Sequence, residues 1–332
     1  MKVLYVTNMY PHKNNPYYGI FVKEQIDTIK HKYGAILENE VFFINGKASK
    51  ANYLRCIFQI RKTIQKFKPD LIHIHYGLSG IFLLFRFLFK FPACIITLHG
   101  GDINSNRKEN GFIRQVTYQI IRRVKTIIVL NQDMEEQLKK YHPKLLRIAC
   151  GVNTELFKPS TIKMKYYKDR ELDSCTINIG FPGSKSRGVK NYTLFSKIIH
   201  LLQEKGYIVN EIEFVNMSRD QININLNSID LLLMTSISEG SPQMIKEAMA
   251  CNCPIVSTNV GDVGYLLKDV KNCCVVDSFF EHDFIEKIEN ILSQNKIERV
   301  SNGRERLMRL ELDADSVANK IFNAYEKAIL KE

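Results

Sequence analysis

Short apolar runs alternate with longer amphipathic segments along the whole chain. Segments 21–31 and 53–67 carry apolar residues at three- and four-residue spacing, which predicts helices. The runs between such segments are short and rich in β-branched residues, which predicts buried parallel strands. These predicted strands are residues 2–7, 71–75, 94–98 and 126–130. The alternation is typical of a doubly wound α/β sheet.

The alternation stops once and then restarts. Residues 148–159 close the first series, and the residues after them are polar and lack an apolar period, which predicts a linker. The expected strands of the second series are residues 175–181, 213–216, 230–235, 254–257 and 274–276. Its expected helices are residues 192–205, 242–250 and 284–294.

The two series predict two Rossmann-like domains. We expect an N-terminal domain over residues 1–159, a linker over 160–174 and a C-terminal domain over 175–313. An amphipathic C-terminal helix over 314–332 is expected to cross back to the first domain. Ligands of open α/β sheets bind at the carboxyl ends of the strands, so two such edges facing each other across a cleft would form a two-substrate site.

Charge is divided unevenly between the halves. Residues 1–158 hold 25 Lys and Arg against 11 Asp and Glu, whereas residues 159–332 hold 22 against 24. The basic half indicates an anionic membrane surface, a phosphate-bearing acceptor or a nucleic acid as partner, or else a solvated lysine-rich surface of no special purpose. Basic charge is the only feature that suggests nucleic acid, and we expect none to bind.

The most apolar segment, residues 81–91, is too short to span a bilayer and contains Arg86 and Lys90. A buried helix is its first interpretation, and a helix lying on a membrane is the alternative. The chain starts with a strand-like run and shows no signal peptide. Its eight cysteines form no CxxC pair, so we expect reduced thiols and a cytoplasmic protein, peripheral at the inner face of the membrane if the alternative holds.

The chemistry concentrates in residues 235–262. A predicted strand there ends in a loop that contains Gly240, and Ser241 is expected to cap a helix with Pro242 as its first residue and Gln243 as its second. The free N–H groups and the dipole at such a helix start suit an anion, in particular a diphosphate.

Two glutamates flank this helix start. Glu247 is expected about a turn and a half into the helix, where its carboxylate can accept hydrogen bonds from the vicinal hydroxyls of a ribose. Glu239 precedes the helix in the loop, nearer to a transferred sugar. Taken alone, the two glutamates would be interpreted as an ordinary loop charge and an ordinary helix-surface charge, and the surrounding residues favour the functional interpretation.

With seven residues between them, Glu239 and Glu247 are similar to the E-x7-E signature of retaining glycosyltransferase family 4, also called glycosyl transferases group 1. The resemblance continues through EGSPQMIKEAMACNCPIVSTNVGDV and implies a GT-B fold. Further segments that resemble landmarks of this family are residues 15–26, 70–75, 97–102 and 151–159.

The resemblance implies roles in the second domain. Glu247 would hold the nucleotide ribose, Glu239 would contact the donor sugar, and a basic pair would hold the diphosphate. Lys190 matches the lysine of that pair. The family's arginine usually stands where this chain has Lys185, and Arg187 is the nearby arginine, so either residue can fill the role. Retaining members of this fold generally work without a bound metal, so we expect no metal and no cofactor.

The first domain contributes its own candidates. Gly19 follows the first strand, and a glycine there lets the backbone approach a donor phosphate or an acceptor. By the resemblance, His99 lies beside the reacting sugar, and Asp102 is a candidate to orient an acceptor hydroxyl. His73 and His75 share one face of a strand, but we expect no metal site from them and His99. No GxGxxG dinucleotide fingerprint occurs.

The predicted function is transfer of a sugar from a nucleotide-sugar donor to a hydroxyl of a glycan or lipid-linked acceptor, with retention, in cell-surface polysaccharide biosynthesis. The alternatives are a GT-B epimerase, a phosphorylase-type enzyme, or a non-catalytic partner subunit of a transferase. The intact Glu239, Glu247 and Lys190 argue against lost catalysis.

Overall fold

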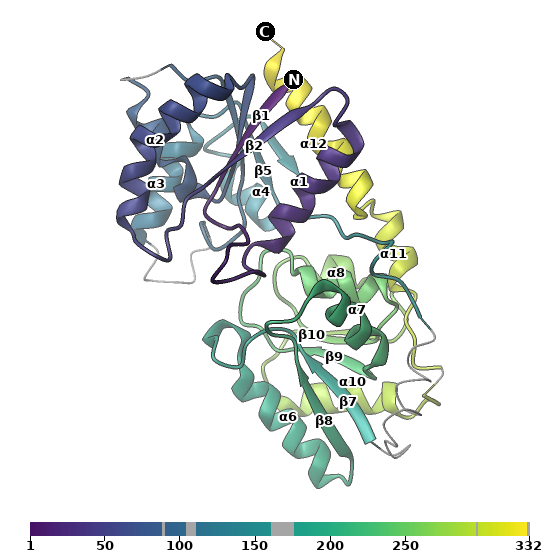
Figure 1. The fold of residues 1–332 in the computed structure, drawn as a ribbon. Helices are drawn as coiled ribbons and strands as arrows, with labels where there is room; N and C mark the ends of the chain where they lie inside the picture. The colour runs from purple at the N-terminus through teal and green to yellow at the C-terminus, as the bar shows by residue number, and fades with distance from the viewer. Residues whose placement is uncertain (88–89, 104–110, 161–175, 297, 331–332) are drawn as a thin grey trace. The chain divides into compact units, whose positions relative to one another are not determined.

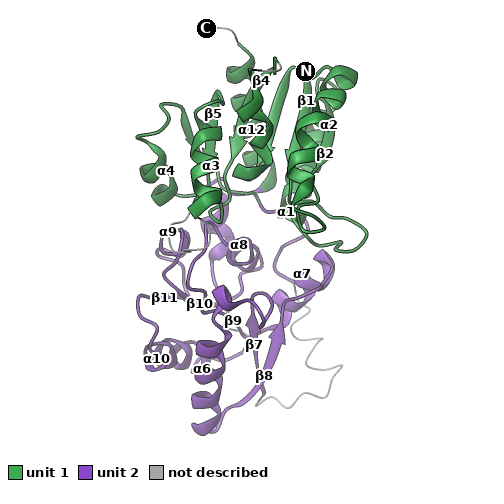
Figure 2. Cartoon of the chain, turned by 90° about the vertical axis from the view of Figure 1, so that its left-hand side faces the viewer, with its two compact units in different colours: residues 1–151, 314–332 green, residues 152–313 purple. Residues whose placement is uncertain are grey.

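The structure is a computed structural model that describes residues 1–87, 90–103, 111–160, 176–296 and 298–330. The chain forms two compact units, which are drawn in different colours in Figure 2. Unit 1 comprises residues 1–151 together with 314–332, and unit 2 comprises residues 152–313. Each unit is an α/β structure built on one parallel sheet.

Unit 1 contains a six-stranded sheet with the order β2-β1-β3-β4-β5-β6, in which every pairing is parallel. Its strands are β1 (Lys2–Thr7), β2 (Glu38–Phe43), β3 (Leu71–His75), β4 (Ala93–Thr97), β5 (Thr126–Val129) and β6 (Leu145–Arg147). Its helices are α1 (Ile20–Tyr33), α2 (Ala51–Phe67), the 3-10 helix η1 (Gly77–Phe85), α3 (Gly111–Ile121), α4 (Gln132–Leu138) and α12 (Ala314–Ile329).

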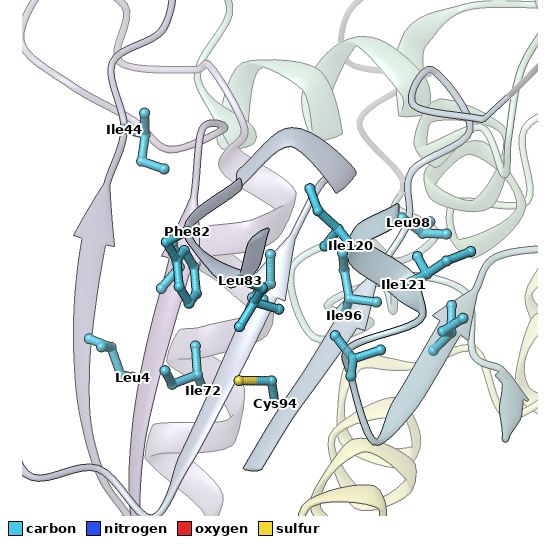
Figure 3. Packing of buried hydrophobic residues seen from close by; sticks show 14 of the residues in the cluster. Leu4, Ile44, Ile72, Phe82, Leu83, Cys94, Ile96, Leu98, Ile120 and Ile121 are labelled. Atoms are coloured by element: carbon cyan, nitrogen blue, oxygen red, sulfur yellow. The ribbon is translucent and has the colours of Figure 1, made fainter. Parts of the chain in front are cut away.

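Successive residues of β1 point to opposite faces of this sheet, and both faces are covered. Leu4 and Val6 belong to a core that includes side chains of α2, η1 and α3. Figure 3 shows part of this core, with Phe82 and Leu83 above the strands. Val3 and Tyr5 belong to a second core on the other face. The strands therefore read as continuous apolar runs, as parallel strands covered on both faces do.

The second core of unit 1 is closed by the C-terminal helix. Side chains of α12, including Val317, Ile321 and Tyr325, pack with side chains of α1 against the sheet. Tyr33 of α1 stacks on Phe322 of α12 with ring centroids 3.9 Å apart. In Figure 1 the yellow α12 lies beside the purple α1, so the two ends of the chain meet in one unit.

Unit 2 contains a five-stranded parallel sheet with the order β11-β10-β9-β7-β8. Its strands are β7 (Thr176–Phe181), β8 (Ile208–Glu213), β9 (Leu231–Met234), β10 (Ile255–Thr258) and β11 (Cys273–Val276). Its helices are η3 (Gly188–Lys190), α6 (Tyr192–Glu204), α7 (Arg219–Ser228), α8 (Gln243–Ala250), α9 (Val263–Leu266), α10 (Glu281–Leu292) and α11 (Gly303–Arg309). Apolar side chains of α6 and α10 share a core with the strands.

Two expected elements differ in the structure. The strand expected at residues 213–216 instead covers Ile208–Glu213. This strand, β8, lies at the edge of the sheet and mixes polar with apolar side chains, so the apolar pattern does not locate it. Residues 81–85 end a 3-10 helix in which Phe82 and Leu83 are buried, whereas Phe87 beyond it is exposed. Residues 161–174 of the expected linker lie outside the described residues.

None of the helices in the described part of the chain has the length and apolar character needed to cross a bilayer.

Candidate functional site

In unit 2, Lys190 and Glu239 form an ion pair. The Nζ atom of Lys190 lies 2.7 Å from Oε1 of Glu239, and both side chains are mostly buried. The hydroxyl of Ser236 donates to the same carboxylate oxygen at 2.8 Å. The lysine that resembles the family's diphosphate ligand thus lies against the glutamate that resembles its sugar ligand.

The local structure holds Lys190 in this place. Its carbonyl oxygen accepts a hydrogen bond from Oγ1 of Thr235 at 3.0 Å, directly after β9. The amide of Ile237 donates to the carbonyl of Val189 at 2.9 Å, which ties the two loops together. A side chain at Gly183 would place its Cβ 3.1 Å from Cε of Lys190, so glycine leaves room for the lysine.

The start of α8 differs by one residue from the expected cap. Pro242, at φ −67° and ψ 116°, is the N-cap, and Gln243 is the first helical residue. The fixed φ of proline suits both a helix and an extended segment, and here ψ is extended. The hydroxyl of Ser241 makes no capping bond, and its buried Oγ has no hydrogen-bond partner among the described residues. This oxygen is positioned beside the helix start proposed for the diphosphate.

Gly240 is held by a close approach of a second loop. Gly261 has φ +60°, and a Cβ there would lie 2.4 Å from the carbonyl oxygen of Gly240. Any side chain at Gly261 would therefore push away the loop that carries Glu239 and Gly240.

Glu247 lies on α8 with a side chain only 1% exposed, and it pairs with Arg219. The guanidinium NH2 of Arg219 donates to Oε1 of Glu247 at 2.6 Å. The guanidinium also lies 4.6 Å from the centre of the Phe157 ring. Arg219 begins α7 after Ser218, whose capping box with Gln221 fixes that helix start.

Arg219 was missed by the sequence reasoning. The Ser-x-x-Gln pattern of the capping box is a signal for the start of α7. No motif links that start to Glu247, which follows 28 residues later.

The two candidates for the second basic position differ in environment. Lys185 pairs with Glu211 at 2.8 Å, and its amide donates to Glu213 at 2.8 Å. Arg187 is exposed and forms no ion pair with any described residue. Lys185 is thus tied to the edge strand β8, whereas Arg187 is available to a ligand; its role stays a prediction.

In unit 1, His99 lies just beyond the carboxyl end of β4, beside His75 at the end of the neighbouring strand β3. Nδ1 of His75 and Nε2 of His99 are 3.3 Å apart. The ring of Phe21 packs against His99 with centroids 5.3 Å apart. This is the edge of a parallel sheet where ligands bind.

Asp102 shapes the loop that carries His99. Its carboxylate is buried and accepts hydrogen bonds from the backbone N–H of His99 at 3.1 Å and of Gly77 at 3.0 Å. Burial raises the pKa of Asp102 to about 6, although these N–H donors oppose the rise. The geometry gives Asp102 a part in holding the backbone, and its contact with an acceptor stays a prediction.

Gly19 caps α1 in the left-handed conformation, with φ +67°. A Cβ there would lie 2.3 Å from the carbonyl carbon of Met9. Glycine is therefore required by the chain's own loop, and the expected contact with a ligand stays a prediction.

His73 lies deeper in the same sheet, with both ring nitrogens engaged. Nδ1 lies 2.7 Å from the hydroxyl of Tyr325 in α12, and Nε2 lies 2.8 Å from Oγ1 of Thr97. Burial lowers the pKa of His73 to about 3 and lowers the pKa of His75 well below its usual value. Both rings are therefore neutral at physiological pH.

These buried histidines predict that unit 1 loses stability in acid. Below the ordinary pKa of 6.5, the unfolded chain binds protons at His73 and His75 that the folded chain excludes. Each histidine then lowers the free energy of unfolding by about 1.4 kcal/mol per pH unit. Asp102 acts in the opposite direction between about pH 4 and 6, because its folded pKa is raised, but one carboxyl offsets only one histidine.

The measurement is urea unfolding at pH 7, 6 and 5. The chain has no tryptophan, so Tyr118→Trp gives a fluorescence reporter confined to unit 1. His73→Gln in this background should flatten the pH dependence. Equal stability at pH 7 and pH 5 would contradict the prediction.

Two family models match the chain. Glycosyltransferase Family 4 matches residues 21–156, and Glycosyl transferases group 1 matches residues 188–306. An uncharacterized glycosyltransferase of Methanocaldococcus jannaschii is 23% identical, over 76% of this chain and 75% of its own length. An Escherichia coli UDP-Gal:α-D-GlcNAc-diphosphoundecaprenol α-1,3-galactosyltransferase is 20% identical, over 80% of this chain and 81% of its own.

A solved structure shares the fold. The crystal structure of Anabaena HepE in complex with UDP-glucose has a TM-score of 0.75 at 14% identity, and the match covers 98% of this chain and all of that one. With the two parallel-sheet units and the family matches, this defines a glycosyltransferase of the GT-B fold, as the resemblance predicted. The chain belongs to glycosyltransferase family 4, the glycosyl transferases of group 1.

Proposed function

We propose that this glycosyltransferase moves a sugar from a nucleotide-sugar donor bound by unit 2 to a hydroxyl on a glycan or lipid-linked acceptor, with retention of anomeric configuration. The observation that carries the proposal is the grouping of Lys190, Glu239 and the start of α8, where the buried hydroxyl of Ser241 has no hydrogen-bond partner in the described part of the chain. A positive charge, free helix N–H groups and a carboxylate suit a sugar diphosphate.

In the proposed reaction, the bond between the anomeric carbon and the diphosphate oxygen breaks while the acceptor oxygen bonds to the same face of that carbon. The acceptor's proton passes to the leaving phosphate. Lys190, with Arg187 as the second cation, stabilises the charge that develops on this phosphate. Glu239 orients the sugar, and Glu247 holds the ribose through its buried carboxylate.

Relatives support the substrate class. The Escherichia coli relative is named for transfer from UDP-Gal to a diphosphoundecaprenol-linked sugar, and the Anabaena structure is a complex with UDP-glucose. We infer a role in cell-surface polysaccharide biosynthesis on the cytoplasmic side of the membrane.

Thermal unfolding in the presence of nucleoside diphosphates and nucleotide sugars tests the donor class. A ligand that binds the folded state raises the Tm, and we expect at least one nucleotide sugar to do so with chelator present. The matched nucleoside without phosphate should give no shift. If no nucleotide sugar raises the Tm, the donor proposal is wrong. Proton NMR of the product then reports whether the anomeric configuration is retained.

We also propose that unit 1 attaches reversibly to anionic bilayers through helix α2. Leu54 and Phe58, one turn apart on α2, are 62% and 67% exposed, while Ile57 and Ile60 are buried on its other side. Exposed basic side chains flank the two apolar residues: Arg55, Arg61, Lys62, Lys66 and Lys68. Apolar side chains bordered by cations suit an acidic membrane surface.

Liposome sedimentation tests this attachment. Binding should require acidic lipid and should fall steeply with salt, since each cation near the surface contributes about 1 kcal/mol within a Debye length. Changing Arg61, Lys62 and Lys66 to Glu should release the protein.

In the matched control, three exposed lysines of unit 2 are changed to Glu, and this variant should bind like the wild type. They are Lys197, Lys268 and Lys271. Protein that stays in the supernatant with acidic liposomes at low salt contradicts the attachment. Equal binding to duplex DNA would point to nucleic acid instead.

A further inference from the structure

Three histidine rings form a row at the carboxyl edge of the sheet in unit 1. The ring of His75 lies between the other two, with its centroid 4.2 Å from that of His73 and 5.5 Å from that of His99. The planes of His75 and His99 differ by only 20°. Between these two rings, Nδ1 of His75 meets Nε2 of His99 at 3.3 Å. His75 is fully buried.

The second nitrogen of His75 decides which ring donates. A neutral imidazole carries one N–H, so a hydrogen bond between two such rings needs a donor on one side and a lone pair on the other. Nε2 of His75 is buried and has no hydrogen-bond partner among the described residues. A buried N–H without an acceptor is costlier and rarer than an unused lone pair. The hydrogen of His75 therefore lies on Nδ1 and is donated to Nε2 of His99.

His73, at the inner end of the row, also carries its hydrogen on Nδ1, and a separate set of hydrogen bonds determines this. The hydroxyl of Tyr325 donates to the hydroxyl of Tyr5 at 3.1 Å, so it accepts from Nδ1–H of His73. Nε2 of His73 then accepts from the hydroxyl of Thr97. Two residues from α12 and β4 thus fix the ring against which His75 packs.

We propose that His75 is a positioning residue that fixes His99 in the tautomer with its hydrogen on Nδ1, so that His99 serves sugar transfer as a hydrogen-bond donor through that atom. The role in transfer rests on the proposed function, whereas the tautomer does not. With Nε2 occupied by the His75 N–H, His99 can gain a second proton only by breaking that bond.

The surroundings favour the same neutral state. Among the described residues, the titratable groups that face the pair are His73 on β3, Tyr5 on β1 with its ring 6.3 Å from His75, and the carboxyl of Asp102 at the backbone of His99. Burial lowers the pKa of His75 well below its usual value, so His75 remains a neutral donor where the enzyme works.

Nitrogen-15 NMR of the histidine rings in the full chain, combined with the pH dependence of kcat, tests the proposal. We expect wild-type His99 to carry its hydrogen on Nδ1. His75→Asn keeps an amide donor near the position of Nδ1, so it should preserve this tautomer and most of the turnover. His75→Phe keeps a ring but no donor, so kcat should fall roughly 10-fold or more with little change in KM. In this variant, the acid limb of the pH dependence of kcat should also move to higher pH.

His142→Phe is the matched control, because His142 is a buried histidine of unit 1 whose Nε2 lies 3.0 Å from the carbonyl of Val124, outside the row. It should leave both the tautomer of His99 and the acid limb unchanged. Wild-type His99 with its hydrogen on Nε2 overturns the proposal, as does His75→Phe with the kcat and pH profile of the control. If His75→Phe does not fold, the wild-type spectrum and His75→Asn still decide. An enzyme that binds no nucleotide sugar refutes the proposed function but leaves the tautomer measurement valid.

Discussion

Glu247→Gln is expected to weaken nucleotide-sugar binding by roughly 10- to 100-fold, which corresponds to the loss of a hydrogen bond to a charged group, and to remove most turnover. The reason is burial: the side chain of Glu247 is 1% exposed, and among the described residues its charge is compensated by Arg219. Glutamine keeps the volume and an oxygen that accepts from Arg219, whereas alanine would leave that guanidinium without its partner. Calorimetric titration with the nucleotide sugar that stabilises the wild type measures the loss.

The control for this variant is Asp230→Asn. Asp230 is another buried carboxylate of unit 2, which lies 3.5 Å from Arg299 and accepts from the amide of Asn178. Its replacement should lower the Tm without changing the affinity for the nucleotide sugar. If Glu247→Gln behaves like Asp230→Asn, Glu247 is a structural residue and does not hold the ribose.

Lys190→Ala should lower kcat by about 100-fold or more, as removal of a positioned charge stabiliser does. The side chain is only 12% exposed and pairs with Glu239, while the backbone carbonyl of Lys190 accepts a hydrogen bond from the hydroxyl of Thr235. Its ammonium therefore lies in a place shielded from solvent, where the interaction of a charge with a bound diphosphate would be stronger than in water. Steady-state kinetics with saturating donor separate this effect from weaker binding.

Lys185→Ala is the matched comparison, since Lys185 lies in the same loop but pairs with Glu211 on β8. We expect it to retain most of the turnover. A kcat for Lys190→Ala as high as that of Lys185→Ala would mean that the loop does not touch the diphosphate.

The parallel strands could be predicted closely because burial on both faces leaves continuous β-branched runs. β1 and β3 have the bounds that the apolar pattern gave, Lys2–Thr7 and Leu71–His75. β8 was misplaced because an edge strand needs fewer apolar side chains, and its sequence IVNEIE alternates weakly. Pro242 was assigned to the helix because its fixed φ does not distinguish a helical residue from an extended cap.

Candidate site residues could be predicted when they belong to one sequence motif. Contacts between residues of two segments that are distant in sequence could not be predicted. Glu239, Glu247 and Lys190 were found through local spacing and resemblance. The Arg219–Glu247 pair depends on how α7 lies beside α8, which no local pattern encodes. Alternation on β3 placed His73 and His75 on one face, but the contact with His99 also requires that β4 be the next strand of the sheet.

Helix α12 has a consequence for the order in which the units fold during synthesis. Unit 2 is continuous in sequence, whereas unit 1 needs both residues 1–151 and the last 19 residues, 314–332. Until α12 emerges from the ribosome, the sheet face that carries Val3 and Tyr5 lacks the cover that α12 gives it. At about 5–20 residues per second, the remainder of the chain takes on the order of 10 to 40 seconds to appear. Of the two units, the one whose synthesis starts earlier is therefore the later to be completed, and this face of its sheet stays exposed in the meantime.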